Sequence, residues 1–451
     1  MFKNRFSYLI TAILIVAIFS CNTTERSINK DDTVWNKQTN IYEVNLRQYT
    51  ASGSFADFAK SLPRLKDMGV EILWFMPITP IGIKGRKMSE TDLGSYYAVR
   101  NYKAVNEEFG TMDDWKKLVK TAHDLDFKVI IDWVANHSAL DNPWVKTHPD
   151  FYTKDSTGKL LSPFNWTDVY KLNYKNNVLR DSMIAAMKYW INETGIDGFR
   201  CDVAEEVPQD FWKQCIDSLR KVKNVFMLAE GEKPWLHDAG FNTTYTWQNM
   251  HLMKELYAGE KSLTYFDSVL NHNISIYPKD ASRLYFTSNH DENSWNGTEY
   301  EKYGDAAKAF AVFTQTIFQS IPLIYSGQEE PNKKRLQFFV KDTIQWKQYA
   351  LVPFYKTLLA LRKSNPALAY DAAYKKLKTS NDKSVFAFLR QKENHKVMVV
   401  LNFSNQPQKF SINDSTINGE PENIFLGKPE KVTSTEFFSL EPWGYVVYDY
   451  K

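Results

Sequence analysis

Polar and charged residues follow four of the apolar, β-branched runs in this 451-residue sequence. They are Asp132 with Asn136-His137, Arg200 with Asp202, Glu230, and His290-Asp291. Taken singly, an acidic residue at the end of a strand is more often a turn former or a helix cap than a catalyst. Four such ends together indicate a single cleft in which several carboxylates meet.

Two of these carboxylates have the chemistry needed to cleave a glycosidic bond with retention. One carboxylate must attack the anomeric carbon, and a second, protonated carboxyl group must donate to the leaving oxygen. Arg200 lies two positions before Asp202, so strand alternation places both on one face, and we predict that the cation holds Asp202 ionised. Glu230 must instead carry a proton, which burial and the neighbouring carboxylates favour. Asp202 and Glu230 can therefore supply the pair.

The elements that would position these residues alternate between strands and amphipathic helices, which is typical of an α/β fold with a parallel sheet. The eight predicted strands are IYEVNLRQY from Ile41, ILWFMPI from Ile72, KVIIDWVANH from Lys128, GFRCDV from Gly198, FMLAEGE from Phe226, FNTTYTW from Phe241, LYFTSNHDE from Leu284 and PLIYSGQEE from Pro322. No glycine-rich dinucleotide motif follows the first strand. We therefore predict a (β/α)₈ TIM barrel over residues 38–370.

Helical spacing of apolar residues predicts the intervening helices. They are 55–69, 113–126, 178–195, 305–320 and 352–368, with Gly69 and Gly195 at C-cap positions. The weakly periodic segment 138–174, rich in Pro, Trp, Asn and Asp, predicts a small excursion over the C-terminal face of the barrel. Short alternating runs over residues 371–451 predict a C-terminal antiparallel β-sandwich domain.

Composition narrows the class of protein. Apolar residues make up 43% and charged residues 24% of the chain, which is ordinary for a folded soluble protein. The formal net charge is only +3 and no long basic run occurs, so we expect no nucleic-acid partner. Aromatic residues make up 15%, and their flat faces suit either a large core or stacking on sugar rings.

The N-terminus has the layout of a secretory signal, with Lys3 and Arg5 before an apolar stretch that is too short to span a bilayer. We predict a signal peptide over residues 1–20. Ile18-Phe19-Ser20-Cys21 resembles a bacterial lipoprotein box, which predicts lipidation of Cys21 and a polar tether over residues 21–37. The expected location is the cell envelope, periplasmic or at the cell surface, with membrane contact only through the lipid. Simple secretion is the alternative.

Four short motifs stand in a fixed order along the chain: DWVANH from Asp132, GFRCDVAEE from Gly198, MLAEGE from Met227 and SNHDEN from Ser288. They resemble the four signature regions of the α-amylase family of glycoside hydrolases. Two further stretches, GSYYAVRNYKAVNEEFGT from Gly94 and IPLIYSGQEE from Ile321, are similar to segments after the second strand and at the eighth strand of that family. The resemblance implies that Asp202 is the nucleophile and Glu230 the general acid/base. It also implies that Asp291 is a third carboxylate that binds sugar hydroxyls and stabilises an oxocarbenium-like state.

The same resemblance implies the residues that bind the reacting sugar. His137, Arg200 and His290 would donate hydrogen bonds to it. Tyr97 matches the aromatic residue that stacks under it, and Tyr96 is the alternative in a shifted register. The implied substrates are starch-derived α-glucans or maltooligosaccharides.

The sequence departs from the family pattern at the residues that bind a metal ion. Many family members bind a structural Ca²⁺ through the Asn that Asn136 matches and an Asp in the excursion. Lys171 stands where that Asp is expected, and Ca²⁺ requires oxygen ligands. Asn136 is thus the one candidate metal ligand, and we expect that no cofactor is required.

Three functions fit the motifs. The first is retaining hydrolysis of α-glucosidic bonds, most simply α-1,4 bonds, through a covalent glycosyl-enzyme intermediate. The second is transglycosylation, in which a sugar hydroxyl replaces water. The third is a non-catalytic glucan-binding protein, which the intact Asp202, Glu230 and Asp291 argue against.

Overall fold

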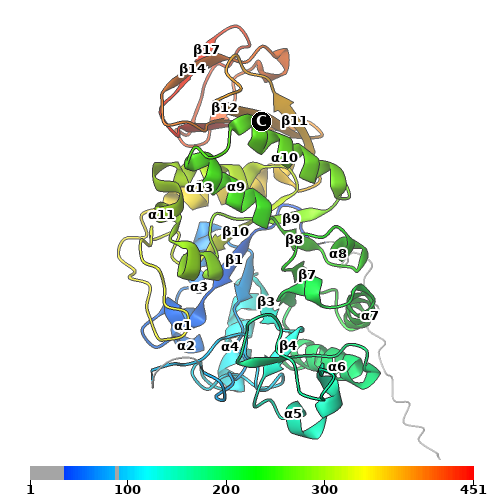
Figure 1. The fold of residues 1–451 in the computed structure, drawn as a ribbon. Coiled ribbons are helices and arrows are strands. Elements are labelled where there is room, and N and C mark those ends of the chain that lie inside the picture. The colour runs from blue at the N-terminus through cyan, green and yellow to red at the C-terminus, as the bar shows by residue number, and fades with distance from the viewer. Residues whose placement is uncertain (1–34, 87–90, 451) are drawn as a thin grey trace, which may run out of the picture. The chain divides into compact units, whose positions relative to one another are not determined.

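The structure is a computed structural model that describes residues 35–86 and 91–450. Eight parallel strands close a barrel in the order β1-β2-β3-β6-β7-β8-β9-β10 (Figure 1). They are β1 (Ile41–Val44), β2 (Ile72–Phe75), β3 (Lys128–Trp133), β6 (Gly198–Cys201), β7 (Phe226–Ala229), β8 (Thr243–Tyr245), β9 (Ser282–Tyr285) and β10 (Ser320–Tyr325). Each predicted strand is present, and the predicted TIM barrel is confirmed.

The strands form in runs rich in apolar and aromatic residues, because both faces of a parallel strand in a barrel are covered. All four residues of β1, β2, β6 and β7 are buried. All eight strands are shorter than the predicted runs, and two examples bear on the site. The first ends at Val44, after which Leu46–Tyr49 form the short helix α1, and the third ends at Trp133, before Asn136 and His137.

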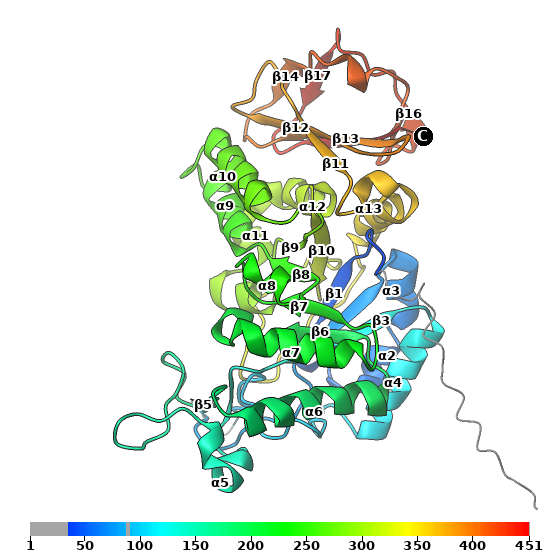
Figure 2. The same cartoon turned by 90° about the vertical axis from the view of Figure 1, so that its right-hand side faces the viewer.

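Helices cover the outside of the barrel (Figure 2). They are α2 (Phe55–Ala59), α3 (Leu62–Met68), α4 (Met112–Asp124), α6 (Asn177–Thr194), α7 (Gln209–Arg220), α8 (Trp235–Asp238), α9 (Trp247–Tyr257), α10 (Leu263–Ile276), α11 (Glu299–Tyr303), α12 (Ala307–Thr316) and α13 (Val352–Ser364). Gly69 and Gly195 end α3 and α6 in the left-handed conformation, as predicted.

The helix predicted over residues 55–69 is wrong as a single element, because α2 ends at Ala59 and α3 begins at Leu62. Pro63 gives the physical reason. A proline inside a helix has no N–H to donate, and its ring clashes with the carbonyl four residues earlier, which is that of Ala59. At the start of α3 the same proline is tolerated, since its N–H would have no partner there.

The excursion after the third barrel strand is a small antiparallel ladder. β4 (His137–Ala139) pairs with β5 (Val169–Lys171), with His137 opposite Lys171. The short helix α5 (Trp144–Thr147) lies between the two strands in the chain. Figure 2 shows β5 and α5 projecting at the end of the molecule that carries α6. The ladder therefore fixes His137 and Lys171 on adjacent strands.

Two antiparallel sheets follow the barrel. The larger contains β11 (Ala373–Leu377), β12 (Val385–Lys392), β13 (His395–Asn402), β18 (Tyr445–Tyr450), β15 (Glu422–Asn423) and β16 (Lys428–Pro429), and the smaller contains β14 (Gln408–Ser411) and β17 (Phe437–Leu440). Leu377, Val400 and Phe410 belong to the apolar core that the two sheets share. Phe266 and Phe313 of the barrel helices pack on Phe386 of the larger sheet. The predicted C-terminal antiparallel domain is confirmed.

The N-terminal predictions fall on residues that the structure does not describe: the signal segment 1–20, Cys21 and the tether up to residue 34. Within the described ranges, no helix combines the length and the apolar character needed to cross a membrane. Cys201 and Cys215 are free and buried.

Candidate active site

The carboxyl ends of the barrel strands bring acidic and basic side chains from separate strands to one mouth. Because all eight strands run parallel, residues that end different strands share the same end of the barrel. Contributors are Glu43 on β1, Trp74 on β2, Asp132 on β3, Arg200 and Asp202 on or just after β6, Glu230 after β7, and His290 and Asp291 after β9. All the strand ends singled out in the sequence therefore converge.

Arg200 joins three of these carboxylates. Its Nη1 lies 2.9 Å from Asp132 Oδ1 and 3.1 Å from Asp202 Oδ1, and its Nη2 lies 3.0 Å from Glu230 Oε2. The guanidinium is fully buried and lies over the ring of Trp74. Asp202 and Glu230 thus lie on either side of one cation, within the reach of a single guanidinium.

Arg200 lowers the pKa of Asp202, but burial and the nearby carboxylates act more strongly in the opposite direction. Burial and the charge of Glu230 raise the pKa of Asp202 well above its ordinary value, and Arg200 opposes this only in part. The reason is that Arg200 divides its charge among three carboxylates, a sharing that sequence spacing does not reveal. Asp202 therefore shares its cation with Glu230 and Asp132 rather than having a cation of its own.

Glu230 is oriented by a strained backbone turn. The N–H of Val203 donates to Glu230 Oε2 at 2.8 Å, and Val203 has a left-handed backbone with φ 35° and ψ 51°. A β-branched residue rarely adopts this conformation, which costs on the order of 1–3 kcal/mol. The turn that follows Asp202 thus aims a hydrogen-bond donor at Glu230 and ties the two carboxyl groups together through the main chain.

His290 lies between two carboxylates. Its Nδ1 contacts Glu43 Oε1 at 2.5 Å, and its Nε2 lies 3.3 Å from Asp291 Oδ2. Burial lowers the pKa of His290, but Asp291 and Glu43 outweigh it and raise the pKa to about 9. His290 is therefore a cation at neutral pH, and it holds positive charge next to Asp291.

This ion pair predicts a loss of stability at alkaline pH. The pKa of His290 is raised from 6.5 in the unfolded chain to about 9 in the fold, so its stabilisation is complete below pH 6.5 and disappears as pH rises through about 9. The expected loss is on the order of 3 kcal/mol. Thermal unfolding of the wild type and of Glu43→Gln between about pH 6.5 and pH 9 measures this loss of stability. The variant should lose less stability over the same window, and identical alkaline profiles would contradict the assignment.

Tyr97, not Tyr96, lies at the barrel mouth. The Tyr97 hydroxyl donates to Asp132 Oδ2 at 3.1 Å and contacts His290 Nε2 at 2.6 Å. Tyr96 is buried elsewhere, where its hydroxyl donates to Asn45. The ring of Tyr97 is only partly buried, so the register read from the sequence puts an accessible aromatic face beside His290.

His137 approaches Asp202 from the excursion. Its Nε2 lies 4.0 Å from Asp202 Oδ2, and burial lowers its pKa to about 3. His137 is therefore neutral and can donate one hydrogen bond without adding charge to the site. With His137, all the residues predicted to surround the reacting sugar lie at the mouth.

The residues around Asn136 do not fit a calcium ion. The Asn136 amide contacts His137 Nδ1 at 3.3 Å, and the ammonium of Lys171 lies 3.4 Å from Glu206 Oε2. A lysine next to this position repels a divalent cation, and its charge already meets a carboxylate. Among the described residues, no group of three or more His, Cys, Asp and Glu side chains could hold a metal ion.

Sequence reasoning missed two buried residues of the site. Glu43 holds His290, and Trp74 Nε1 donates to Asp132 Oδ2 at 3.3 Å. Both lie within strands rather than after the strand ends. The available signal was a single charge, Glu43, inside the apolar run Ile41–Val44.

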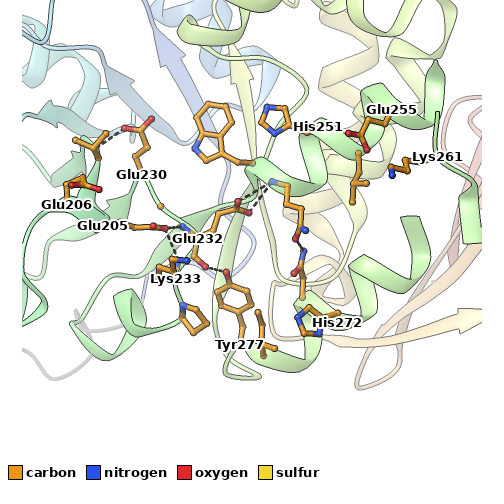
Figure 3. A pocket seen from close by; sticks show the side chains of 18 of the residues that line it. Glu205, Glu206, Glu230, Glu232, Lys233, His251, Glu255, Lys261, His272 and Tyr277 are labelled. Carbon is orange, nitrogen blue, oxygen red and sulfur yellow. Dashed lines mark hydrogen bonds between the residues drawn. The ribbon is translucent and has the colours of Figure 1, made fainter. Parts of the chain in front are cut away.

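A cleft of about 960 Å³ opens beside Glu230 (Figure 3). Val203, Glu206, Trp247 and His251 contribute to its lining, whereas Asp202 and Asp291 do not. The site therefore has a buried part that is rich in carboxylates and a roomier part on the side of Glu230. This arrangement brings two carboxyl groups to one guanidinium and leaves open space beside Glu230.

Comparisons with known proteins agree with this geometry. The chain matches the families described as "Alpha amylase, catalytic domain" over residues 26–171 and 154–349, and "Maltogenic Amylase, C-terminal domain" over residues 374–447. It is similar to the solved structure of a noncanonic maltogenic α-amylase, AmyB, from Thermotoga neapolitana. The TM-score is 0.84 and the identity 29%, over 92% of this chain and 99% of that chain.

Two curated relatives share less of the sequence. The α-amylase MalA of Haloarcula japonica is 25% identical over 397 residues, which are 84% of this chain and 57% of that protein. An α-1,4-glucan:maltose-1-phosphate maltosyltransferase of Corynebacterium pseudotuberculosis is 28% identical over 345 residues, 70% of this chain and 50% of that protein. This chain thus spans about half the length of these two relatives.

Proposed function

This chain belongs to the α-amylase family of glycoside hydrolases, and on that premise we propose that it hydrolyses α-1,4-glucosidic bonds in starch-derived glucans or maltooligosaccharides with retention of configuration. The observation that carries the proposal is the placement of Asp202 and Glu230 on one guanidinium, with Asp291 beside the cationic His290 at the same mouth. These are the acidic groups that a double displacement at an anomeric carbon requires.

In the first step Asp202 attacks the anomeric carbon while Glu230 gives its proton to the leaving glycosidic oxygen. A C–O bond forms between the sugar and Asp202, and the bond to the leaving sugar breaks. In the second step Glu230, now a carboxylate, takes a proton from water, and the water oxygen displaces Asp202. Two inversions at one carbon give net retention.

The charges around the pair support this assignment of roles. The N–H of Val203 donates to Glu230 Oε2 at 2.8 Å and fixes the carboxyl group that acts on the leaving oxygen. Arg200 lies 3.1 Å from Asp202 and stabilises the ionised form of the nucleophile. Asp291 binds sugar hydroxyls, Tyr97 stacks on the ring, and His137 and His290 donate hydrogen bonds. Side chains and water suffice for this chemistry, without a metal ion.

Transglycosylation is the alternative outcome of the same first step. The glycosyl group on Asp202 would then pass to a sugar hydroxyl. Similarity to a protein named as a maltosyltransferase supports this alternative. The roomy cleft beside Glu230 could hold such an acceptor. Water and sugar acceptors differ only in the second step, so product analysis separates them.

The test is incubation of the purified protein with a panel of α-glucans, maltooligosaccharides and α-linked disaccharides. Hydrolysis with retention gives new reducing ends that are first released as the α-anomer. NMR spectra recorded before mutarotation identify the anomer. Transglycosylation gives products longer than the starting oligosaccharide. Failure to cleave any α-glucan, or initial release of the β-anomer, would overturn the proposal.

We also propose that Cys21 is lipidated and holds the enzyme at the cell envelope. The support is the run Ile18-Phe19-Ser20-Cys21 after a basic and apolar leader. Expression of the full chain in a bacterium should place it in the detergent-soluble membrane fraction, and Cys21→Ala should release it. An unchanged membrane fraction in the variant would contradict lipidation.

A further inference from the structure

Glu43 is a charged residue within the otherwise apolar strand β1, and its side chain is completely buried. Its Oε1 accepts from His290 Nδ1 at 2.5 Å and from the His290 backbone N–H at 3.4 Å. Its Oε2 has no hydrogen-bond partner among the described residues. Apolar residues of similar volume often replace a buried ion pair without loss of stability. Stability alone therefore does not explain a carboxylate at this position.

The His290 ring is held in one orientation. Tyr97 stacks on it at 23° with ring centroids 5.5 Å apart, and Trp74 meets it nearly edge-on at 83° and 6.0 Å. With Nδ1 bound to Glu43, the opposite nitrogen, Nε2, faces the barrel mouth. There it lies 2.6 Å from the Tyr97 hydroxyl and 3.3 Å from Asp291 Oδ2. Glu43 thus decides which edge of the imidazole the mouth receives.

The hydrogen bonds around His290 have one consistent direction. The Tyr97 hydroxyl has a single proton, which it donates to Asp132 Oδ2 at 3.1 Å, so this hydroxyl accepts from His290 Nε2. An ionised Glu43 can only accept, so Nδ1 also carries a proton. A ring that donates from both nitrogens is a cation, in agreement with the raised pKa of His290. In a neutral ring that keeps its proton on Nδ1, Nε2 would accept, and the Tyr97 hydroxyl would have to turn away from Asp132.

Other charged and titratable groups face the Glu43–His290 pair from several sides of the mouth. Burial raises the pKa of Glu43, whereas His290 and Arg200 lower it, so its ionised form depends on these cations. Tyr245 and Tyr325 stay neutral, because burial raises their pKa values well above the ordinary range. The groups that face the pair are Tyr97, Asp132, Arg200, Tyr245, Asp291 and Tyr325.

We propose that Glu43 is a positioning residue for the reaction, which acts through His290. It holds the imidazole as a donor on both nitrogens, so that a charged N–H points from His290 to Tyr97, Asp291 and the reacting sugar. The same contact fixes the direction of the Tyr97 hydroxyl. This inference rests on the proposed hydrolysis of α-glucans and adds to it a residue that does not touch the sugar.

The first test is the pH dependence of kcat/KM for α-maltosyl fluoride, which reports the groups of the free enzyme. Fluoride leaves without a proton from Glu230, so titration of the acid does not mask that of His290. The wild type should lose activity with a midpoint at about pH 9. In Glu43→Gln the amide oxygen can still accept from Nδ1, but the negative charge is absent. The midpoint should therefore fall by about 1–3 pH units, while kcat/KM at about pH 5.5 should stay within about threefold of the wild type.

Asp197→Asn is the matched control. His123 Nε2 lies 2.8 Å from Asp197 Oδ2, so this variant also removes a carboxylate from an imidazole. Asp197 directly precedes β6 (Gly198–Cys201) and lies at the opposite end of the barrel from the mouth. Its alkaline midpoint should equal that of the wild type. Thermal unfolding at each pH confirms that the compared proteins are folded.

The second test observes the ring directly, by NMR of protein labelled with ¹⁵N in its histidine rings. His290→Gln identifies the signal of His290. In the wild type both ring nitrogens should stay protonated up to about pH 9, and this titration does not require Glu43→Gln to fold. A neutral His290 in the wild type at about pH 7.5, or equal alkaline midpoints in the wild type and folded Glu43→Gln, would overturn the inference. A wild type that does not consume the fluoride would instead refute the proposed function, and the NMR titration would still test the hold of Glu43 on His290.

Discussion

Asp202→Ala should lower kcat on maltooligosaccharides by several orders of magnitude, because covalent catalysis is lost while binding groups remain. The fold should persist, since Arg200 keeps its ion pairs with Asp132 and Glu230 when Asp202 is removed. Initial rates under saturating substrate measure the loss. A variant with kcat within about tenfold of the wild type would remove Asp202 from the nucleophile role.

Replacing Asp202 should increase the stability of the fold at neutral pH while it removes activity. The folded-state pKa of Asp202 lies above its unfolded value, so folding is favoured at low pH, and this gain is lost as pH rises through the higher value. Asp202→Asn, which is never charged, should therefore unfold at a higher temperature than the wild type at neutral pH. The difference should shrink at pH 4 and below.

Asp197 provides the matched control at the start of β6. Burial raises the pKa of Asp197, but contacts with His123 and Lys223 lower it below its ordinary value. The ionised form of Asp197 therefore stabilises the fold. Asp197→Asn should lower the unfolding temperature at neutral pH and leave the kcat of the folded protein unchanged. Changes of opposite sign in the unfolding temperature at Asp202 and Asp197 would distinguish a carboxylate of the site from a structural carboxylate.

Glu230→Gln should lower kcat/KM on glucans by about 10²- to 10⁴-fold, the usual contribution of general acid–base catalysis. The amide oxygen can still accept from the Val203 N–H, so the turn after Asp202 should be preserved. The loss should be much smaller for the first step with α-maltosyl fluoride, since fluoride leaves without a proton. Equal losses on both substrates, measured by single-turnover kinetics, would contradict a role for Glu230 as the acid.

Much of the fold could be predicted because its signals are local. Runs rich in apolar and aromatic residues mark most of the barrel strands, and the polar residues at their ends share one mouth because the strands are parallel. The break between α2 and α3 was also readable, since Pro63 lies inside the predicted helix. Apolar spacing continues across Pro63 and therefore does not reveal this break.

What could not be predicted depends on contacts between distant elements. Arg200 seemed dedicated to Asp202 by spacing, but the barrel also brings Asp132 and Glu230 to the same guanidinium. Glu43 lies far from His290 in sequence and meets it only because β1 and β9 flank the same barrel mouth. The cleft beside Trp247 arises from the way α9 and α10 pack, which periodicity does not specify.

The central claim is that Asp202 forms a covalent bond to the sugar while Glu230 acts on the leaving group and on water. Glu230→Gln incubated with α-maltosyl fluoride should form the intermediate but hydrolyse it slowly, so the glycosyl-enzyme should accumulate. Mass spectrometry of the intact protein and its peptides measures this directly. We predict a mass increase of one maltosyl group on the peptide that contains Asp202. An unmodified protein that still consumes the fluoride, or a maltosyl group on any other residue, would contradict the account.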